Sequence, residues 1–243
     1  MKVRVKGMTL RTARLAAILS LPMMLLSVAV AVGADPSPSL SAAGWEERTS
    51  GYWSSVPRIK AEANGNRLSA EFALPPGSGV SWSKKVALDN AAGGILAFEF
   101  SSDGTNSSSR DYKEFRTRFP VSVTVVFGKD SQELGWRTRF LYFFRKIRHG
   151  FPPGGIRLVY AWGNQVPVGS MYRTGEEETV FILAGEEDKG KTVRERRNLR
   201  EDFMAAYGRY PSGPVTSIIV GAARPSGEKE QLMGRVVLTL PGP

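Results

Sequence analysis

The chain has 243 residues, no cysteine and a formal net charge of +10. Its length is enough for one or two domains with a sizeable hydrophobic core. The absence of cysteine excludes a disulfide framework, a thiol nucleophile and thiolate metal sites. The 26 glycines and 15 prolines are typical of a chain in which many short strands are joined by turns.

The N-terminus has the pattern of a secretory signal peptide, which we place at residues 1–34. Five basic residues within the first 14 precede an apolar run from Leu15 to Val32. Small residues at positions 32–34 suit the signal peptidase, so we expect cleavage after Ala34. The alternative is an uncleaved anchor, because the run approaches the length of a membrane span. The pattern predicts a bacterial periplasmic or secreted protein.

Half of the positive charge belongs to this N-terminal segment. Removing residues 1–34 takes away five of the 33 basic residues and none of the 23 acidic ones, which leaves 28 minus 23, a net charge of +5. A positive charge of this size does not indicate a nucleic-acid-binding protein, so we expect no nucleic-acid partner.

The remaining chain predicts a flexible leader, residues 35–44, and a single domain, residues 45–243. Within that domain, short apolar segments alternate with turn signals. The predicted strands span residues 66–74, 79–88, 93–100, 119–128, 155–163, 178–185, 215–223 and 234–240. Strands at this spacing, with no helices alternating between them, favour an all-β fold. We predict an antiparallel β-sandwich, jelly-roll or galactose-binding-like, with one or two flanking helices.

Two segments interrupt the strands and predict helices. Residues 198–208 begin with Asn198, a favourable N-cap residue, and end with Gly208, a favourable C-terminal residue. Residues 136–151 place aromatic side chains on one side of a helix and basic side chains on the others. We expect this second helix to cover the core; peripheral contact with an anionic membrane or with a partner protein is the alternative.

The octapeptide GEEDKGKT, residues 185–192, matches the phosphate-binding pattern G-x-x-x-x-G-K-[ST]. A P-loop needs small, uncharged residues whose backbone N–H groups surround the phosphate oxygens. Here Glu186, Glu187 and Asp188 would repel the phosphate, and no apolar strand ends in an aspartate suited to hold magnesium. We therefore interpret the stretch as a charged hairpin turn that joins TVFILA to TVRERR, and we expect no nucleotide and no cofactor.

Catalytic arrangements have little support in the sequence. The only histidine, His149, lies in a basic stretch, and no G-x-S-x-G motif is present, so a Ser-His-Asp triad is not indicated. One histidine without cysteine also leaves no predicted metal site. The open alternative is a carboxylate-dependent hydrolase on a jelly roll, with Glu71 and Glu99 as its candidates, although a strand glutamate commonly faces solvent.

From Arg67 onward the order of motifs resembles the exported bacterial proteins grouped as domain of unknown function 3047. The stretches that carry the resemblance are RLSAE, GVSWSKKVALD, GILAFEF, VSVTVVFG, PPGGIRLVYAWGNQVPVGS and RERRNLREDFMAAYGRYPSGPVTSIIVGA. The positions that fit the family pattern are Tyr160, Trp162, Pro167, Gly169, Arg197, Asn198, Asp202, Tyr207 and Gly208. The resemblance implies a β-sandwich of the carbohydrate-binding kind and brings no established activity.

The chain departs from the family pattern at ARPSGE, residues 223–228. Relatives usually carry an acidic Asp-x-Asp-Asn-Thr run at this place. A ligand or metal site formed by that run would be lost or altered in this chain.

These observations favour a non-catalytic module that binds a glycan or another cell-envelope component through aromatic side chains, because flat sugar faces stack on rings. The aromatic candidates are Trp82, Trp136, Tyr160 and Trp162. The resemblance adds Arg197, Asn198 and Asp202. Each ring could instead pack in the core. The alternatives are the hydrolase described above and a membrane-associated structural or assembly protein that uses residues 136–151.

Overall fold

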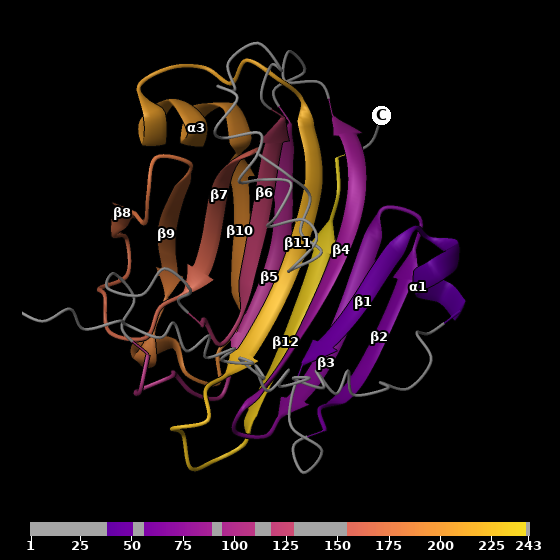
Figure 1. Cartoon of the computed structure of the whole chain (residues 1–243), viewed down its shortest axis with the longest axis vertical. Helices are drawn as coiled ribbons and strands as arrows, with labels where there is room; N and C mark the ends of the chain where they lie inside the picture. The colour runs from indigo at the N-terminus through magenta and orange to yellow at the C-terminus, as the bar shows by residue number, and fades with distance from the viewer. Residues whose placement is uncertain (1–37, 51–55, 89–93, 110–117, 129–154, 242–243) are drawn as a thin grey trace, which may run out of the picture. The chain divides into compact units, whose positions relative to one another are not determined.

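The structure is a computed structural model that describes residues 38–50, 56–88, 94–109, 118–128 and 155–241. All of them belong to one compact unit of the chain, Ala31–Pro243. The described residues form twelve strands in two sheets, which confirms the predicted β-sandwich (Figure 1). The segment 136–151, with Trp136 and His149, lies outside the described residues.

Strands make up most of the described chain. They are β1 (Trp45–Ser50), β2 (Arg58–Asn64), β3 (Arg67–Leu74), β4 (Ser78–Leu88), β5 (Ile95–Ser102), β6 (Ser122–Gly128), β7 (Gly155–Trp162), β8 (Met171–Arg173), β9 (Glu178–Ala184), β10 (Val193–Asn198), β11 (Val215–Arg224) and β12 (Leu232–Thr239). The helical segments are α1 (Pro38–Ala42), the short 3-10 helix η2 (Glu186–Asp188) and α3 (Leu199–Tyr207). Within this part of the chain, no helix has the length and apolar character that crossing a membrane requires.

The two sheets differ in size and in strand direction. The seven-stranded sheet has the order β1-β4-β11-β6-β7-β9-β8, and the five-stranded sheet has the order β10-β5-β12-β3-β2. All neighbours in the five-stranded sheet are antiparallel. In the seven-stranded sheet β7 and β9 are parallel, because the chain forms β8 on the far side of β9 before it enters β9. The predicted antiparallel arrangement therefore holds for all neighbours but this pair.

The core lies between the sheets and is rich in aromatic rings. Alternate residues along each strand point inward, as the two-residue period of a strand requires. The ring pairs that join the sheets, with their centroid distances, are Phe72–Trp82 at 6.5 Å, Phe98–Tyr160 at 5.7 Å and Phe100–Trp162 at 5.8 Å. At these distances the rings contact one another directly and hold the sheets together.

Helix α3 closes one end of the sandwich. Its N-cap, Asn198, accepts hydrogen bonds from the backbone N–H groups of the first turn, and Gly208 ends the helix with φ 68°. The helix buries Leu199, Phe203 and Ala206. The Phe203 ring lies 4.8 Å from that of Phe127 at the end of β6, so the helix is fixed to the seven-stranded sheet.

Part of the stretch that the sequence predicts as a leader is structured. Residues Pro38–Ala42 form α1, which lies beside β1 and β2 (Figure 1). Leu40 of α1 is fully buried and belongs to the core. A single buried leucine in a run of proline, serine and alanine gives too weak a periodic signal to be recognised in the sequence.

The predicted hairpin at residues 185–192 is wrong. β9 lies in the seven-stranded sheet beside β7 and β8, whereas β10 lies in the five-stranded sheet beside β5. The stretch therefore carries the chain from one sheet to the other through η2. Both flanking strands lie at the residues that the sequence predicts. The apolar strand β9 pairs with β7 and β8, however, and the charged strand β10 pairs with β5.

Candidate functional site

A groove crosses the outer face of the five-stranded sheet and has a volume of about 550 Å3. The strand register places outward side chains along it in two rows. One row contains Lys60, Glu71, Arg235 and Ser101, and the other contains Arg58, Ala73, Met233 and Asp103. Each row takes residues from β2, β3 and β12 and ends in or directly after β5, so the groove runs across the strands rather than along them.

The floor of the groove is the line of residues between the two rows. Ile59, Phe72 and Gly234 lie there, with the side chains of Ile59 and Phe72 packed toward the core. A Cβ atom at Gly234 would collide with the Phe72 ring and would lie 2.7 Å from the carbonyl oxygen of Ser101. Glycine at this position therefore lets the Phe72 ring lie directly beneath the backbone of β12.

Charges along the groove are unevenly balanced. Glu71 faces Arg235, with 3.8 Å between the carboxylate and guanidinium atoms, and the Asp103 carboxylate accepts a hydrogen bond of 2.8 Å from the N–H of Met233. Among the described residues, no side-chain partner is found for Arg58 or Lys60, and both are exposed. The uncompensated charge is therefore positive and lies at the β2 end.

The β5 end of the groove is held by the loop that follows β5. The Ser102 hydroxyl donates to the carbonyl oxygen of Gly104 at 2.7 Å, and the N–H of Gly190 donates to the carbonyl oxygen of Ser102 at 2.8 Å. Both contacts fix the backbone next to Asp103. This end of the groove thus depends on how residues 103–109 are anchored.

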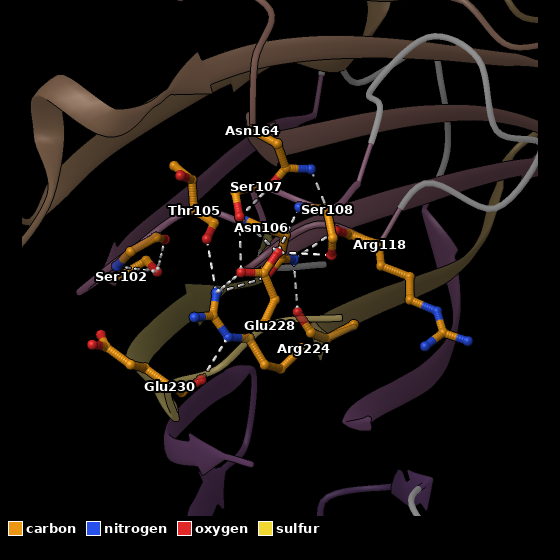
Figure 2. Close-up of polar contacts among 12 residues, drawn as sticks. Ser102, Thr105, Asn106, Ser107, Ser108, Arg118, Asn164, Arg224, Glu228 and Glu230 are labelled. Carbon is orange, nitrogen blue, oxygen red and sulfur yellow. Dashed lines mark hydrogen bonds and ion pairs between the residues drawn. The ribbon is translucent and has the colours of Figure 1, made fainter. Parts of the chain in front are cut away.

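Beyond Asp103, a buried polar network anchors the loop that follows β5 (Figure 2). Because β5 begins beside α3, where the Leu199 N–H donates to Gly94 O, this loop lies at the opposite end of the sandwich. Asn106 is fully buried; its side chain donates to the carbonyl oxygens of Arg118 and Ala223 at 2.7 and 2.9 Å. Arg224, at the end of β11, donates to the carbonyl oxygen of Thr105 at 2.7 Å and to the Asn106 side chain at 3.1 Å. These bonds join the loop after β5 to the seven-stranded sheet.

Glu228 completes the network on the loop between β11 and β12. Its carboxylate accepts bonds from the Ser108 N–H at 2.7 Å, from the Ser108 hydroxyl at 2.8 Å and from the Ser107 hydroxyl at 3.1 Å, and it faces Arg224 at 3.7 Å. Partial burial alone would raise the pKa of the Glu228 carboxyl. The bonds from Ser108 and Ser107 and the charge of Arg224 outweigh burial, so the pKa lies below its ordinary value.

This network includes the stretch at which we expect the sequence to depart from the family pattern. Arg224 and Glu228 both belong to the stretch ARPSGE, residues 223–228, and both side chains are directed at each other and at the loop (Figure 2). Within the described residues, no group of acidic or histidine side chains is arranged to hold a metal ion. The stretch serves here as a loop anchor.

The predicted aromatic platform is corrected by the structure. Trp82, Tyr160 and Trp162 have no exposed surface, because they occupy inward positions of β4 and β7 and pack against phenylalanines of the other sheet. Buried rings offer no face for a sugar to stack on. Trp136 lies outside the described residues.

The structure brings together Tyr160, Arg197 and Asp202, three of the predicted site residues. The Tyr160 hydroxyl donates to Asp202 at 2.7 Å, and Arg197 binds the same carboxylate through two nitrogens at 2.9 and 2.7 Å. Burial, together with the charge of Asp202, raises the pKa of Tyr160 well above its ordinary value, so the hydroxyl stays protonated. The cluster fixes the start of α3 to β7 and β10, while Asn198 serves as the helix N-cap.

The octapeptide at residues 185–192 has no P-loop geometry. Five of its backbone N–H groups are already used within the fold. The donors and acceptors are Gly185 to the Asp188 carboxylate, Asp188 to Gly185 O, Lys189 to Glu186 O, Gly190 to Ser102 O, and Lys191 to Asp188 O. The stretch leads into strand β10 instead of a helix. Most of the backbone donors that a P-loop would offer a phosphate are therefore occupied, and the chain continues into a strand where a P-loop would begin its α-helix.

The two carboxylates considered for hydrolysis share the outer face of the five-stranded sheet. Glu71 on β3 and Glu99 on β5 are separated by β12 and offset by two residues, which places their Cα atoms roughly 12 Å apart. Glu99 pairs with Arg194 on β10, on the side away from Glu71. Both side chains are well exposed, at 61% and 42%, whereas a general acid needs a desolvated setting.

Sequence reasoning missed most of the groove residues. Met233, which is 53% exposed, and Gly234 fall near the start of a predicted strand and carry no motif. Arg58 and Lys60 belong to β2, which the sequence did not reveal. The one available signal was Gly234 itself, because a glycine inside a strand indicates that another group lies close to the backbone there.

The chain belongs to the family described as "Protein of unknown function (DUF3047)", whose pattern matches residues 72–230, and this confirms the resemblance in its sequence. No curated protein sequence matches it. Among solved structures it is similar to endoglucanase 3 of Trichoderma harzianum from family GH12. The two sequences are 12% identical, the match covers 82% of this chain and 90% of the endoglucanase, and the TM-score is 0.46. It is also similar to the catalytic domain of Humicola grisea Cel12A, at 11% identity, 82% and 93% coverage, and TM-score 0.48.

Proposed function

We propose that this DUF3047 protein is an exported, non-catalytic β-sandwich that binds a glycan or another extended envelope component in the groove of the five-stranded sheet. The observation that carries the proposal is the groove itself, an open channel of about 550 Å3 that crosses four strands and is lined by both apolar and charged groups. Extended clefts of this kind suit a linear ligand that is held by several weak contacts.

The shape of the groove favours recognition through side chains. The backbone groups of β3, β12 and β5 are paired in the sheet ladder, so a ligand lying across these strands cannot extend the sheet as an added strand. The Glu71 and Arg235 pair presents an acceptor and a donor side by side, which can both bond to neighbouring hydroxyl groups. A polyhydroxylated chain fits this arrangement.

The same face supports binding rather than hydrolysis. The carboxylates of Glu71 and Glu99 are both well exposed, and each faces an arginine. Glycoside hydrolysis requires one carboxyl group with a raised pKa as the general acid, and a solvated carboxylate beside an arginine is a poor candidate for that role. The ligand is therefore expected to leave the groove unchanged.

The groove can be tested with one substitution made at two places. Ala73→Ile would narrow the groove, and Ala97→Ile would place the same side chain on β5, on the same face but outside the groove. We expect Ala73→Ile to weaken binding about tenfold or more and Ala97→Ile to leave it unchanged. Affinity gel electrophoresis in hydroxyethylcellulose and carboxymethylcellulose, with pull-down on purified peptidoglycan, measures this. Failure of the unaltered protein to bind any of these polymers would contradict the proposal.

Export is tested separately. The basic and apolar pattern of residues 1–34 leads us to expect a mature chain that begins after Ala34 and is released with the periplasmic or secreted fraction. N-terminal sequencing of the protein from fractionated bacteria measures both. A full-length chain in the cytosol would contradict export without affecting the groove.

A further inference from the structure

From the charges along the groove we infer that its ligand is an anionic glycan, with carboxylate or phosphate groups that bind between Arg58 and Lys60 at the β2 end. This inference rests on the proposed function, because it names the ligand class of the same groove. It goes beyond that proposal by stating the charge of the ligand and by placing its anionic group at the β2 end of the groove.

Arg58 and Lys60 stand on opposite sides of the groove. Arg58 is aligned with Ala73 in one row and Lys60 with Glu71 in the other, so their Cα atoms are two residues, roughly 7 Å, apart. Both side chains point to the outer face, and both are long enough to reach a group placed between them. An anion at the β2 end of the groove would thus be flanked by two cations.

The acidic groups of the groove do not cancel these two charges. Glu71 is directed to Arg235, at 3.8 Å, and no ion pair joins it to Lys60 although the two residues are aligned. Asp103 lies at the other end, on the far side of β12, and its carboxylate is bonded to the N–H of Met233. The groove is therefore positive at β2, balanced at β3 and β12, and acidic at β5.

This gradient distinguishes a charged polymer from a neutral one. A neutral chain would gain hydroxyl contacts along the groove but nothing from Arg58 and Lys60. A chain with carboxylate or phosphate groups would add charge-assisted hydrogen bonds to both, and these are about twice as strong as neutral ones. The arginine guanidinium also matches the two oxygens of either anion in a planar, paired contact.

The test compares polymers that share a backbone. Affinity gel electrophoresis uses hydroxyethylcellulose, carboxymethylcellulose and soluble phosphorylated cellulose with the full mature chain. We expect strong retardation by at least one anionic polymer, little by the neutral one, and weakening as sodium chloride is raised. A preference for one of the two anionic polymers shows whether the subsite binds carboxylate or phosphate groups. Either preference supports the inference.

The matched variants are Arg58→Gln with Lys60→Gln, and Arg67→Gln. Arg67 is an exposed cation on β3, on the same face but outside the groove, so it controls for general charge. We expect the double variant to lose about tenfold in affinity for the anionic polymers and the Arg67 variant to lose little. Thermal melting confirms that each variant is folded.

The outcomes separate the inference from the proposal on which it rests. Equal binding of neutral and anionic cellulose, lost in Ala73→Ile, would overturn the anionic subsite and keep the groove as a glycan site. Equal losses in the Arg67 variant and the double variant would reduce the effect to general charge and also overturn the inference. Binding of no polymer at all would contradict the proposed function itself.

Discussion

Helix α3 closes one end of the sandwich with apolar side chains and one buried polar cluster around Asp202, whereas a hydrogen-bonded network that includes Arg224 and Glu228 closes the other. At the helix end, Phe203 is buried in the core and contacts Phe127. At the loop end, Arg224 and Asn106 are buried and every bond depends on a specific partner. Apolar packing is distributed over many contacts, but a buried polar network is stable only when all its members are paired.

The two ends also differ in how far apart in the chain their contacting residues lie. Helix α3 itself is specified locally, by a cap, an apolar period and a terminal glycine within about ten residues. Its attachment adds the bond from Tyr160 to Asp202, which are 42 positions apart. The loop end joins residues that are 118 positions apart, such as Arg224 and Asn106. We therefore expect the first end to behave as part of the core and the second to open independently.

The largest effect is expected from Phe203→Ala. The ring is 1% exposed, so its removal leaves a cavity between α3 and the core and lowers the free energy of unfolding by about 4 kcal/mol. Urea denaturation measures the change. Met204→Ala, at a neighbouring position that is 37% exposed, is the control and should change stability by less than about 0.5 kcal/mol. Similar effects in both variants would show that α3 is not a core element.

Arg224→Met is expected to cost about 3 kcal/mol, because it leaves a buried carboxylate and the Asn106 side chain without their charged partner. The loss should be local. Hydrogen exchange at residues 103–109 should accelerate, while exchange in α3 keeps its native rate. Arg196→Met, at an exposed position of β10, is the control. Uniform acceleration in both ends would remove the distinction between them.

The smallest effect is expected from Glu228→Gln, with a cost of about 1 kcal/mol at neutral pH because the charged acceptor is replaced by a neutral one. The folded-state pKa of Glu228 lies below its ordinary value of 4.5, so the carboxylate stabilises the fold fully above pH 4.5. That contribution is lost as the pH falls through the folded-state pKa. Thermal melts between pH 7 and pH 3 should therefore converge for the variant and the unaltered protein. Parallel curves would show that Glu228 is not coupled to folding.

The strands that the sequence missed share one property. β1, β2 and β8 are edge strands, and so is β10, which was given the wrong neighbour. Edge strands carry charged residues that prevent association with other sheets, and in stretches such as WEERTS and VRERRN these charges obscure the two-residue apolar period. Strands such as β3, in which exposed and buried residues alternate, keep that period and are predicted well.

The site was harder to predict than the fold for a related reason. Aromatic residues attract attention in a sequence, yet Trp82 and Trp162 lie at inward positions where burial is most favourable. The groove instead depends on the alignment of four strands, and on Gly234 meeting Phe72 across two of them. That alignment is a property of the register, which no short motif in the sequence contains.

The occupied amides of residues 185–192 also limit what protein engineering could achieve there. Exchanging Glu186, Glu187 and Asp188 for glycine would remove the repulsion that sequence reasoning emphasised. The N–H groups of residues 188–191 would still donate to backbone carbonyls, and the chain would still continue into β10. A nucleotide pocket could be created at this place only by rebuilding the crossover between the layers.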